Sequence, residues 1–127
     1  MSEALVKAFV LCDEITENPN GTGQKDLSGA GLAVIQASLP FPIKRTFWVY
    51  LEIEDQKATG QIQLAIMRAD SGRRLFFRMM PVAFGDPLRT TIVVVRVFDC
   101  SLPAPGVYLV ELWYDGEWQL DQRVEVV

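Results

Sequence analysis

The chain contains no histidine, and this absence excludes several common kinds of site. Without an imidazole there is no Ser-His or Cys-His nucleophile pair, no histidine-ligated metal and no side chain whose ordinary pKa lies near neutral pH. Cysteine is also scarce, because the sequence holds only Cys12 and Cys100. Two distant cysteines do not make a zinc cluster, so we expect two reduced thiols near strand ends, no metal site and no cofactor.

Long apolar runs are absent as well. Apolar residues make up 50% of the sequence, but they occur in short runs. None of these runs approaches the ~18 residues that a membrane-spanning helix needs. Near the N-terminus, Glu3 stands where a secretory signal carries positive charge, and Lys7 interrupts the apolar run. We therefore expect a cytoplasmic protein with no membrane partner, folded as one domain over residues 1–127.

The net charge of −4 is distributed unevenly along the chain. Residues 1–67 and 97–127 carry −3 and −5, whereas residues 68–96 carry +4 from six arginines and two acids. Nucleic-acid-binding domains are usually basic as a whole, so a nucleic-acid partner is not expected here.

Short apolar segments separated by turn signals predict an all-β fold. Their number and spacing indicate an antiparallel β-sandwich of about eight strands, immunoglobulin-like or jelly-roll-like. The continuous apolar run Leu5–Cys12 predicts a strand buried on both faces, and the valine-rich run Thr91–Phe98 a strand in the middle of a sheet. Turn residues at Asn18–Gly23 predict a reversal into a return strand over residues 32–37, and the prolines of Leu39–Pro42 a crossover between sheets.

The segment around Trp48 shows the clearest alternation. Four apolar residues at every second position predict a core face: Phe47, Val49, Leu51 and Ile53. The opposite face holds Trp48, Tyr50, Glu52 and Glu54, which are our candidate interaction residues. Aromatic residues rimmed by charge are typical of a protein interface, so a protein partner or self-association through this sheet is expected. Burial of both aromatics under a second layer is the simpler alternative and stays open.

The pattern of apolar residues predicts the strand register of two hairpins. Setting Leu64 and its apolar neighbours against the apolar set Leu75, Phe77 and Met79, rather than against Arg78, requires an even loop. We predict four residues, Asp70–Arg73. In the last hairpin, a three-residue turn Tyr114–Gly116 with a left-handed Gly116 pairs Leu112 with Trp118 and Val110 with Leu120. Just before that hairpin, Pro105–Tyr108 fits a sandwich corner whose tyrosine hydroxyl bonds back to nearby backbone.

Four short segments carry a family resemblance: Leu11–Ile15, Leu27–Gly29, Pro105–Tyr108 and Asp115–Glu117. On these segments the chain resembles a family of small bacterial domains of unknown function, with the L-C-D-E-I segment near the N-terminus as the most distinctive motif. The resemblance implies a stand-alone β-sandwich over the whole chain. It implies no activity and no functional residues. A long, glycine-containing loop at residues 18–26 departs from the family's usual shorter turn.

Three groups of charged residues are candidate chemical sites. Arg68, Arg74 and Arg78 could bind an anion, because guanidinium groups clamp phosphate. Alternatively, the three arginines lie on one solvent-exposed face and pair with Glu52, with Glu54 or with acids of a partner subunit.

The carboxylates offer two further sites. Asp13 and Glu14 could serve a hydrolase-type enzyme, although neighbours in a strand point to opposite faces. Asp70, Asp99 and Asp115 could bind calcium from loops at one end, although each also fits a turn. The leading hypothesis is therefore a non-catalytic protein-interaction or structural module. The alternatives are an enzyme with paired carboxylates and a domain that binds an anion or a small ligand.

Overall fold

The computed structural model describes residues 4–17, 24–37, 39–85 and 89–127. Within these ranges all regular structure is β, and no helix is long and apolar enough to cross a membrane. The strands are β1 (Leu5–Cys12), β2 (Glu14–Glu17), β3 (Lys25–Ser28), β4 (Val34–Ile35), β5 (Ile43–Glu54), β6 (Thr59–Arg68), β7 (Arg74–Ala83), β8 (Thr91–Leu102), β9 (Gly106–Tyr114) and β10 (Glu117–Val126).

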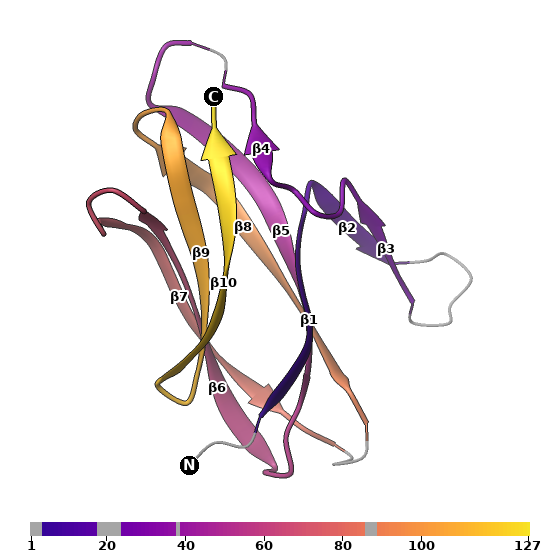
Figure 1. The fold of residues 1–127 in the computed structure, drawn as a ribbon. Helices are drawn as coiled ribbons and strands as arrows, with labels where there is room; N and C mark the ends of the chain where they lie inside the picture. The colour runs from indigo at the N-terminus through magenta and orange to yellow at the C-terminus, as the bar shows by residue number, and fades with distance from the viewer. Residues whose placement is uncertain (1–3, 18–23, 38, 86–88) are drawn as a thin grey trace.

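Two sheets pack face to face in Figure 1. One has three strands in the order β1-β5-β8, and the other has five in the order β4-β10-β9-β6-β7. The core between them is almost entirely apolar, and the predicted β-sandwich is confirmed. The expected count of about eight strands is too low, because β2 and β3 form a separate hairpin and β4 has only two residues.

The predicted alternation in β5 is confirmed. Its core-facing residues are at most 3% exposed: Phe47, Val49, Leu51 and Ile53. β5 occupies the centre of its sheet, with β1 on one side and β8 on the other. A fully paired central strand fixes which side chains reach the opposing sheet, so its outer face is fixed as well.

β1 and β8 are the two edges of the three-stranded sheet. The prediction that β1 is buried on both faces and the prediction that β8 lies in the middle of a sheet are therefore both wrong. β1 has the predicted bounds, but Leu5 is 52% exposed and the register shifts between Val6 and Ala8. β8 was expected in the middle of a sheet. It instead forms an edge, because the only described strand that pairs with β8 is β5, and Ile92 and Phe98 on its outer side are exposed.

The return strand predicted over residues 32–37 is reduced to β4, which pairs in parallel with β10. Just before it, the N–H groups of Gly31 and Leu32 donate to the Leu11 carbonyl, so the chain crosses from β1 to β10 there. The predicted reversal at Asn18–Gly23 lies outside the described residues, although the flanking strands β2 and β3 are antiparallel. The crossover predicted at Leu39–Pro42 is confirmed, since it joins β4 to β5 in the other sheet.

The predicted register of the β6–β7 hairpin is wrong. Five residues, 69–73, separate the strands instead of four, and Leu64 lies opposite Arg78. β7 also carries one extra residue, since Ile66 pairs with Phe76 but Met67 pairs with Arg74. A one-residue change of register exchanges the faces of a strand. Phe77 and Met79 therefore lie outside the core.

The β9–β10 hairpin closes with the two-residue turn Asp115–Gly116 rather than three residues. Both residues have positive φ, 49° and 83°, as a type I′ turn requires. The left-handed Gly116 is confirmed. Gln119 is a bulge between Trp118, opposite Trp113, and Leu120, opposite Leu112. This extra residue returns Leu120 to the core side and leaves Trp118 outside.

The predicted corner at the start of β9 is confirmed. The Tyr108 hydroxyl donates a 2.6 Å hydrogen bond to the carbonyl oxygen of Ala104, while its ring is buried in the core. Cys12 and Cys100 are free and buried near strand ends, as expected.

Candidate interaction surface

The outer face of the three-stranded sheet is mostly uncharged. The register places Tyr50 between Val10 and Val94, and Trp48 between Cys12 and Arg96. We define the Trp48 face by these apolar residues on the outer side: Ala8, Val10, Trp48, Tyr50, Ile92 and Val94, together with Phe98, whose ring lies against the Arg96 guanidinium.

This face is open to solvent. Ile92 is 46% exposed and Phe98 is 59% exposed, while Trp48 and Tyr50 are half-buried. An antiparallel sheet with one solvated face ordinarily presents polar side chains there. The Trp48 face is therefore more apolar than the solvated face of an ordinary antiparallel sheet.

The charged groups on this face have partners within it. The Tyr50 hydroxyl donates to Glu52 at 2.8 Å, and burial together with this carboxylate raises the pKa of Tyr50 to about 12. Glu54 accepts a 2.5 Å hydrogen bond from the Thr90 hydroxyl. The guanidinium of Arg96 lies 4.6 Å from the ring centre of Phe98 and 5.9 Å from that of Trp48. The four candidate interaction residues thus share one face, with the acids at one end and Arg96 at the other.

A second apolar surface covers the outer face of the five-stranded sheet. Cross-strand pairing places Met79, Gln63, Trp113 and Trp118 in one row. We define the Trp113 face as the apolar residues on this side: Ala65, Met67, Phe77, Met79, Leu109, Trp113 and Trp118.

Sequence reasoning missed the Trp113 face because it assigned Phe77, Met79 and Trp118 to the core. Their exposed fractions are 44%, 46% and 51%. A signal was present, since apolar residues occupy both parities of β7 and of β9. Such strands have apolar side chains left over for the outer face.

The three candidate anion-binding arginines do not share a face, so the expectation that they form one solvent-exposed face is wrong. Arg74 pairs with Met67 on the outer side, whereas Arg78 pairs with Leu64 on the core side. Arg68 is bound to Asp70 at 3.1 Å. They lie in the five-stranded sheet, away from Glu52 and Glu54 in β5.

The candidate catalytic and calcium-binding acids are spread over the surface. Asp13 is exposed just after β1 and forms an ion pair with Arg45, and Glu14 begins β2. Asp70 and Asp115 lie at opposite ends of β9, because Ala69 bonds Val107 while Asp115 follows Tyr114. In the described ranges, no three Asp, Glu or Cys side chains are grouped as metal ligands.

A buried polar cluster stands at the end of β9, and the sequence analysis did not identify it. Asp55 is 5% exposed and accepts hydrogen bonds from the Tyr114 hydroxyl at 2.5 Å and the Lys57 N–H at 3.2 Å. Burial raises the pKa of Asp55, but these hydrogen bonds and the Lys57 charge outweigh it and leave the pKa below its ordinary value.

The cluster also ties two loops together, since Lys57 pairs with Asp115 and the Gln61 N–H donates to Asp115 at 2.8 Å. One signal was available: Asp55 continues the core-face positions of β5. The hydrogen bonds and the ion pair of this cluster join strands and loops of the sandwich to one another, so the cluster stabilises the fold.

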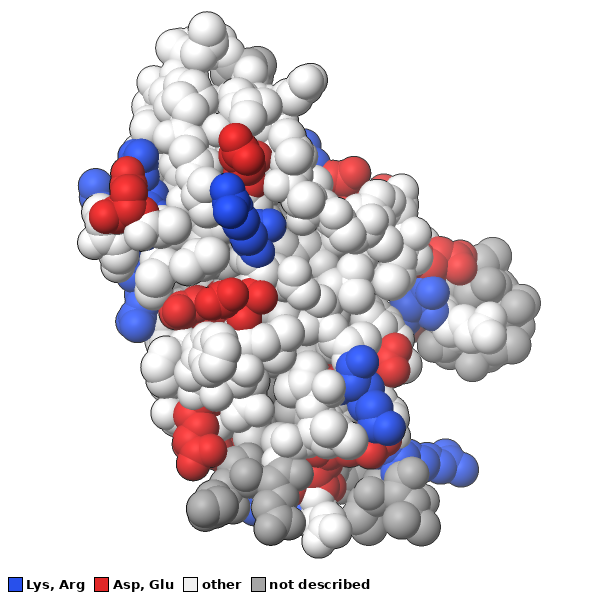
Figure 2. All heavy atoms as spheres, in the orientation of Figure 1, with Lys and Arg blue, Asp and Glu red and all other residues white. Residues whose placement is uncertain are grey.

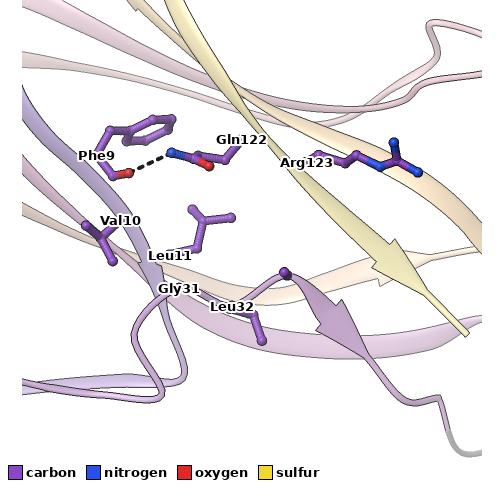
Figure 3. Close-up of a pocket in the computed structure, with 8 residues that line it drawn as sticks. Phe9, Val10, Leu11, Gly31, Leu32, Gln122 and Arg123 are labelled. Carbon is purple, nitrogen blue, oxygen red and sulfur yellow. Dashed lines mark hydrogen bonds between the residues drawn. The ribbon is translucent and has the colours of Figure 1, made fainter.

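Two hollows bear on the ligand-binding alternative. One of about 190 Å³ opens between β1 and β10, where the Gln122 side chain donates a 2.9 Å hydrogen bond to the Phe9 carbonyl (Figure 3). Drug-sized ligands usually need roughly 300 to 1,000 Å³. The other, between the sheets and next to Tyr108, holds about 10 Å³, hardly the space of one water. Neither hollow favours a ligand carried inside the sandwich.

A family model described as a family of unknown function, DUF6941, matches residues 7–127. The chain belongs to the DUF6941 family. Membership confirms the resemblance to an uncharacterised domain family, and it assigns no activity. No curated protein matches the chain.

Two solved structures match the chain at low sequence identity. The β-glucosidase EmGH1 from Erythrobacter marinus matches with a TM-score of 0.55 and 12% identity over 99% of this chain and 16% of that chain. A β-glucosidase from Listeria innocua in complex with gluconolactone matches with a TM-score of 0.44 and 14% identity over 94% of this chain and 16% of that chain. This DUF6941 chain thus spans about a sixth of each of these enzymes. The EmGH1 match shows similarity of fold alone.

Proposed function

We propose that this chain is a non-catalytic protein-interaction module that docks a partner protein on the Trp48 face. One observation carries the proposal: apolar side chains occupy the solvent side of a sheet whose other side already faces the core. Monomeric proteins rarely expose large contiguous apolar patches, and such patches commonly mark protein interfaces.

The charges at the rim indicate the chemistry of the partner. Glu52 and Glu54 lie at one end of the face, and Arg96 lies beside Trp48. An apolar partner surface with a basic residue placed over Glu52 fits this arrangement, because rim charges fix orientation while the apolar centre is desolvated. The Tyr108 corner and the strand orders support an immunoglobulin-like arrangement. The free, buried thiols support a reducing compartment such as the cytoplasm.

Site-specific photo-crosslinking in the native cell tests this proposal. A photoreactive residue replaces Ile92 or Phe98, and in the control it replaces the exposed Gln36. We expect the same adduct from the first two sites and none from the control. The cross-linked protein is then purified, and its Kd is measured by calorimetry against the unmodified chain, Ile92→Glu and Gln36→Glu.

Ile92→Glu is expected to raise the Kd at least ~10-fold, because it places a charge in a desolvated interface. Gln36→Glu is expected to leave the Kd unchanged, and a melting curve verifies that both variants are folded. Equal cross-linking from Gln36, no adduct from either face position, or an unchanged Kd for Ile92→Glu would overturn the proposal.

A further inference from the structure

We propose that the partner protein binds through an extended acidic segment that pairs with the free edge of β8. This inference rests on the proposed function and states which part of the partner contacts the chain. The bound segment becomes a fourth strand of the three-stranded sheet. Its outward side chains continue the Trp48 face, and its inward side chains lie opposite β7 in the other sheet.

One edge of β8 has no strand beside it in the described part of the chain. On its other side, β5 pairs with β8 without interruption from Thr91 to Val97. Among the described residues, no further backbone hydrogen bond reaches this stretch. An edge strand presents a row of unpaired N–H and C=O groups, which another strand can pair with.

The edge of β8 also lacks the features that usually prevent such pairing. Pro81 in the edge strand β7 has no N–H to donate, and the edge strand β1 has a register shift between Val6 and Ala8. The stretch Thr91–Val97 contains no proline, no bulge and a single charge, that of Arg96. β8 is therefore the edge that is best suited to accept a strand.

The five-stranded sheet extends past β8 on this side of the sandwich. In the middle of β6, the core-side residues are at most 2% exposed: Ile62, Leu64 and Ile66. Their partners on β7 are less covered, because Phe76 and Met80 are half-buried and Arg78 is exposed. Figure 1 shows β7 to the left of β8, which is the last strand of its sheet on that side. A strand added to β8 would cover these residues of β7.

Two arginines border the position of the added strand, one on each sheet. Phe47 and Ile66 line one hollow between the sheets. Arg96 is one residue from the partner of Phe47 in the β5–β8 pairing. Arg78 is two residues from the partner of Ile66 in the β6–β7 pairing. The two cations therefore lie at a similar level along the sandwich.

Neither Arg78 nor Arg96 belongs to an ion pair among the described residues. Figure 2 shows basic side chains on the side of the molecule where β7 lies in Figure 1. An acidic residue in the added strand would meet Arg96 on the outer side or Arg78 on the inner side, and opposite charges on neighbouring strands stabilise their pairing.

The same charges favour a partner segment over a second copy of this chain. A second copy that paired through β8 would bring another Arg96 beside these two arginines, and like charges in that position repel each other. The single acid of β8, Asp99, lies beyond the regular stretch. Glu52 pairs with Ile92 near the start of β8, so the basic residue proposed for the partner lies at the other end of the segment.

Photo-cross-linking at two adjacent phenylalanines tests where the partner lies. A photoreactive phenylalanine replaces Phe76, on the core side of β7, or Phe77, on the outer side of the same strand. We expect the partner that is captured from Ile92 to be captured from Phe76 as well, and not from Phe77. Mass spectrometry of the Phe76 adduct identifies the bound segment, which should contain alternating apolar residues and an acid.

A synthetic peptide of that segment then tests the charge. Arg78→Glu is expected to raise the Kd for the peptide at least ~10-fold, because it sets two acids together. Arg74→Glu makes the same change on the outer side of β7 and should leave the Kd unchanged. A peptide with lysine in place of its acid should recover most of the affinity for Arg78→Glu. Melting curves verify that both variants are folded.

Methylation of the peptide's backbone nitrogens tests the strand pairing. Only every second amide of an added strand faces β8. Methylation of that set should raise the Kd at least ~10-fold, whereas methylation of the alternate set should leave it unchanged.

The outcomes separate this inference from the proposed function. An adduct from Ile92 without one from Phe76 would overturn this inference alone, whereas no adduct from either position would remove both. A second copy of this chain in the Phe76 adduct would contradict the partner segment. An unchanged Kd for Arg78→Glu, or equal Kd values for the two methylated peptides, would contradict the charge or the strand pairing.

Discussion

The hydroxyl of Tyr114 donates a 2.5 Å hydrogen bond to Asp55, the one buried charged residue in the described ranges. A carboxylate is costly to bury unless it is hydrogen-bonded or paired. We expect Tyr114→Phe to lower the free energy of unfolding by about 1–3 kcal/mol, since the acid loses a buried donor. Urea unfolding measures the difference. Tyr50→Phe is the matched control: it removes a hydroxyl bound to half-exposed Glu52 and should cost less.

Asp55 should also make stability depend on pH in the acid range. Its pKa is lowered in the folded protein from an ordinary value of 3.8, so the unfolded chain binds more protons there. The contribution of Asp55 is therefore complete above the ordinary pKa and is lost as pH falls through the folded one. Between about pH 5 and pH 3, wild-type stability should fall more steeply than that of Asp55→Asn. Identical slopes would contradict this assignment.

Asp115 should contribute a pH dependence of the same sign. The hydrogen bond from Lys57, followed by the Gln61 N–H, lowers the pKa of Asp115. When Asp115→Asn is combined with Asp55→Asn, the free energy of unfolding should therefore depend still less on pH between about pH 5 and pH 3. Unfolding measured at matched ionic strength tests this, and a double variant as steep as wild type would argue against both groups.

Gly60 should tolerate no side chain. A Cβ at this position would collide with the hydroxyl and ring of Tyr114, which Asp55 holds in place. We expect Gly60→Ala to destabilise the protein by about 1–3 kcal/mol through overpacking. Gly85→Ala is the control, because a Cβ there meets nothing within 4 Å. Equal melting temperatures for the two variants would show that Tyr114 can move.

The bulge at Gln119 gives a test by deletion. Removing Gln119 leaves Trp118 opposite Trp113 and every later pair of β10 unchanged, so we expect a cooperative melt close to that of wild type. Removing Asp121 instead shifts the following residues by one position and turns Val124 out of the core. Circular dichroism melts distinguish the two: loss of cooperativity should appear in the second deletion alone.

The thiols should react slowly in the folded protein. Burial raises the pKa of Cys100 to about 11, and burial followed by the Asp13 charge raises the pKa of Cys12. Since the thiolate is the reactive species, alkylation by iodoacetamide should be slow at neutral pH and accelerate in urea. Two fast thiols in the absence of denaturant would contradict the packing of both residues.

The alternating strand β5, the left-handed Gly116 and the Tyr108 corner could be predicted because each depends on local sequence. The face of β7 and the position of Trp118 could not, because each depends on one extra residue in a strand. No residue type marks a bulge in the sequence, because the position of a bulge depends on how the two strands of the hairpin pair. The position of β8 was predicted wrongly for a related reason. Valine content favours a strand, but whether that strand lies at an edge depends on how many strands pair with it.

For the site, the Trp48 face could be predicted because it is the second face of one alternating strand. The Trp113 face combines residues from four strands, so two errors of register were enough to conceal it. Asp55 was visible as an acid at a core-face position, but its partner Tyr114 lies 59 residues away and only the fold joins them.

Tyr108 and Tyr114 stand at the two ends of β9, and each hydroxyl is bound to a different loop. A strand secured at one end can fray from the other, but β9 has no free end from which to begin. We expect its amide protons to exchange with solvent only through global unfolding, whereas the amides of the edge strand β7 exchange through local opening. β9 would then be the last element of the sandwich to come apart, and its exchange rate would report the stability of the entire fold.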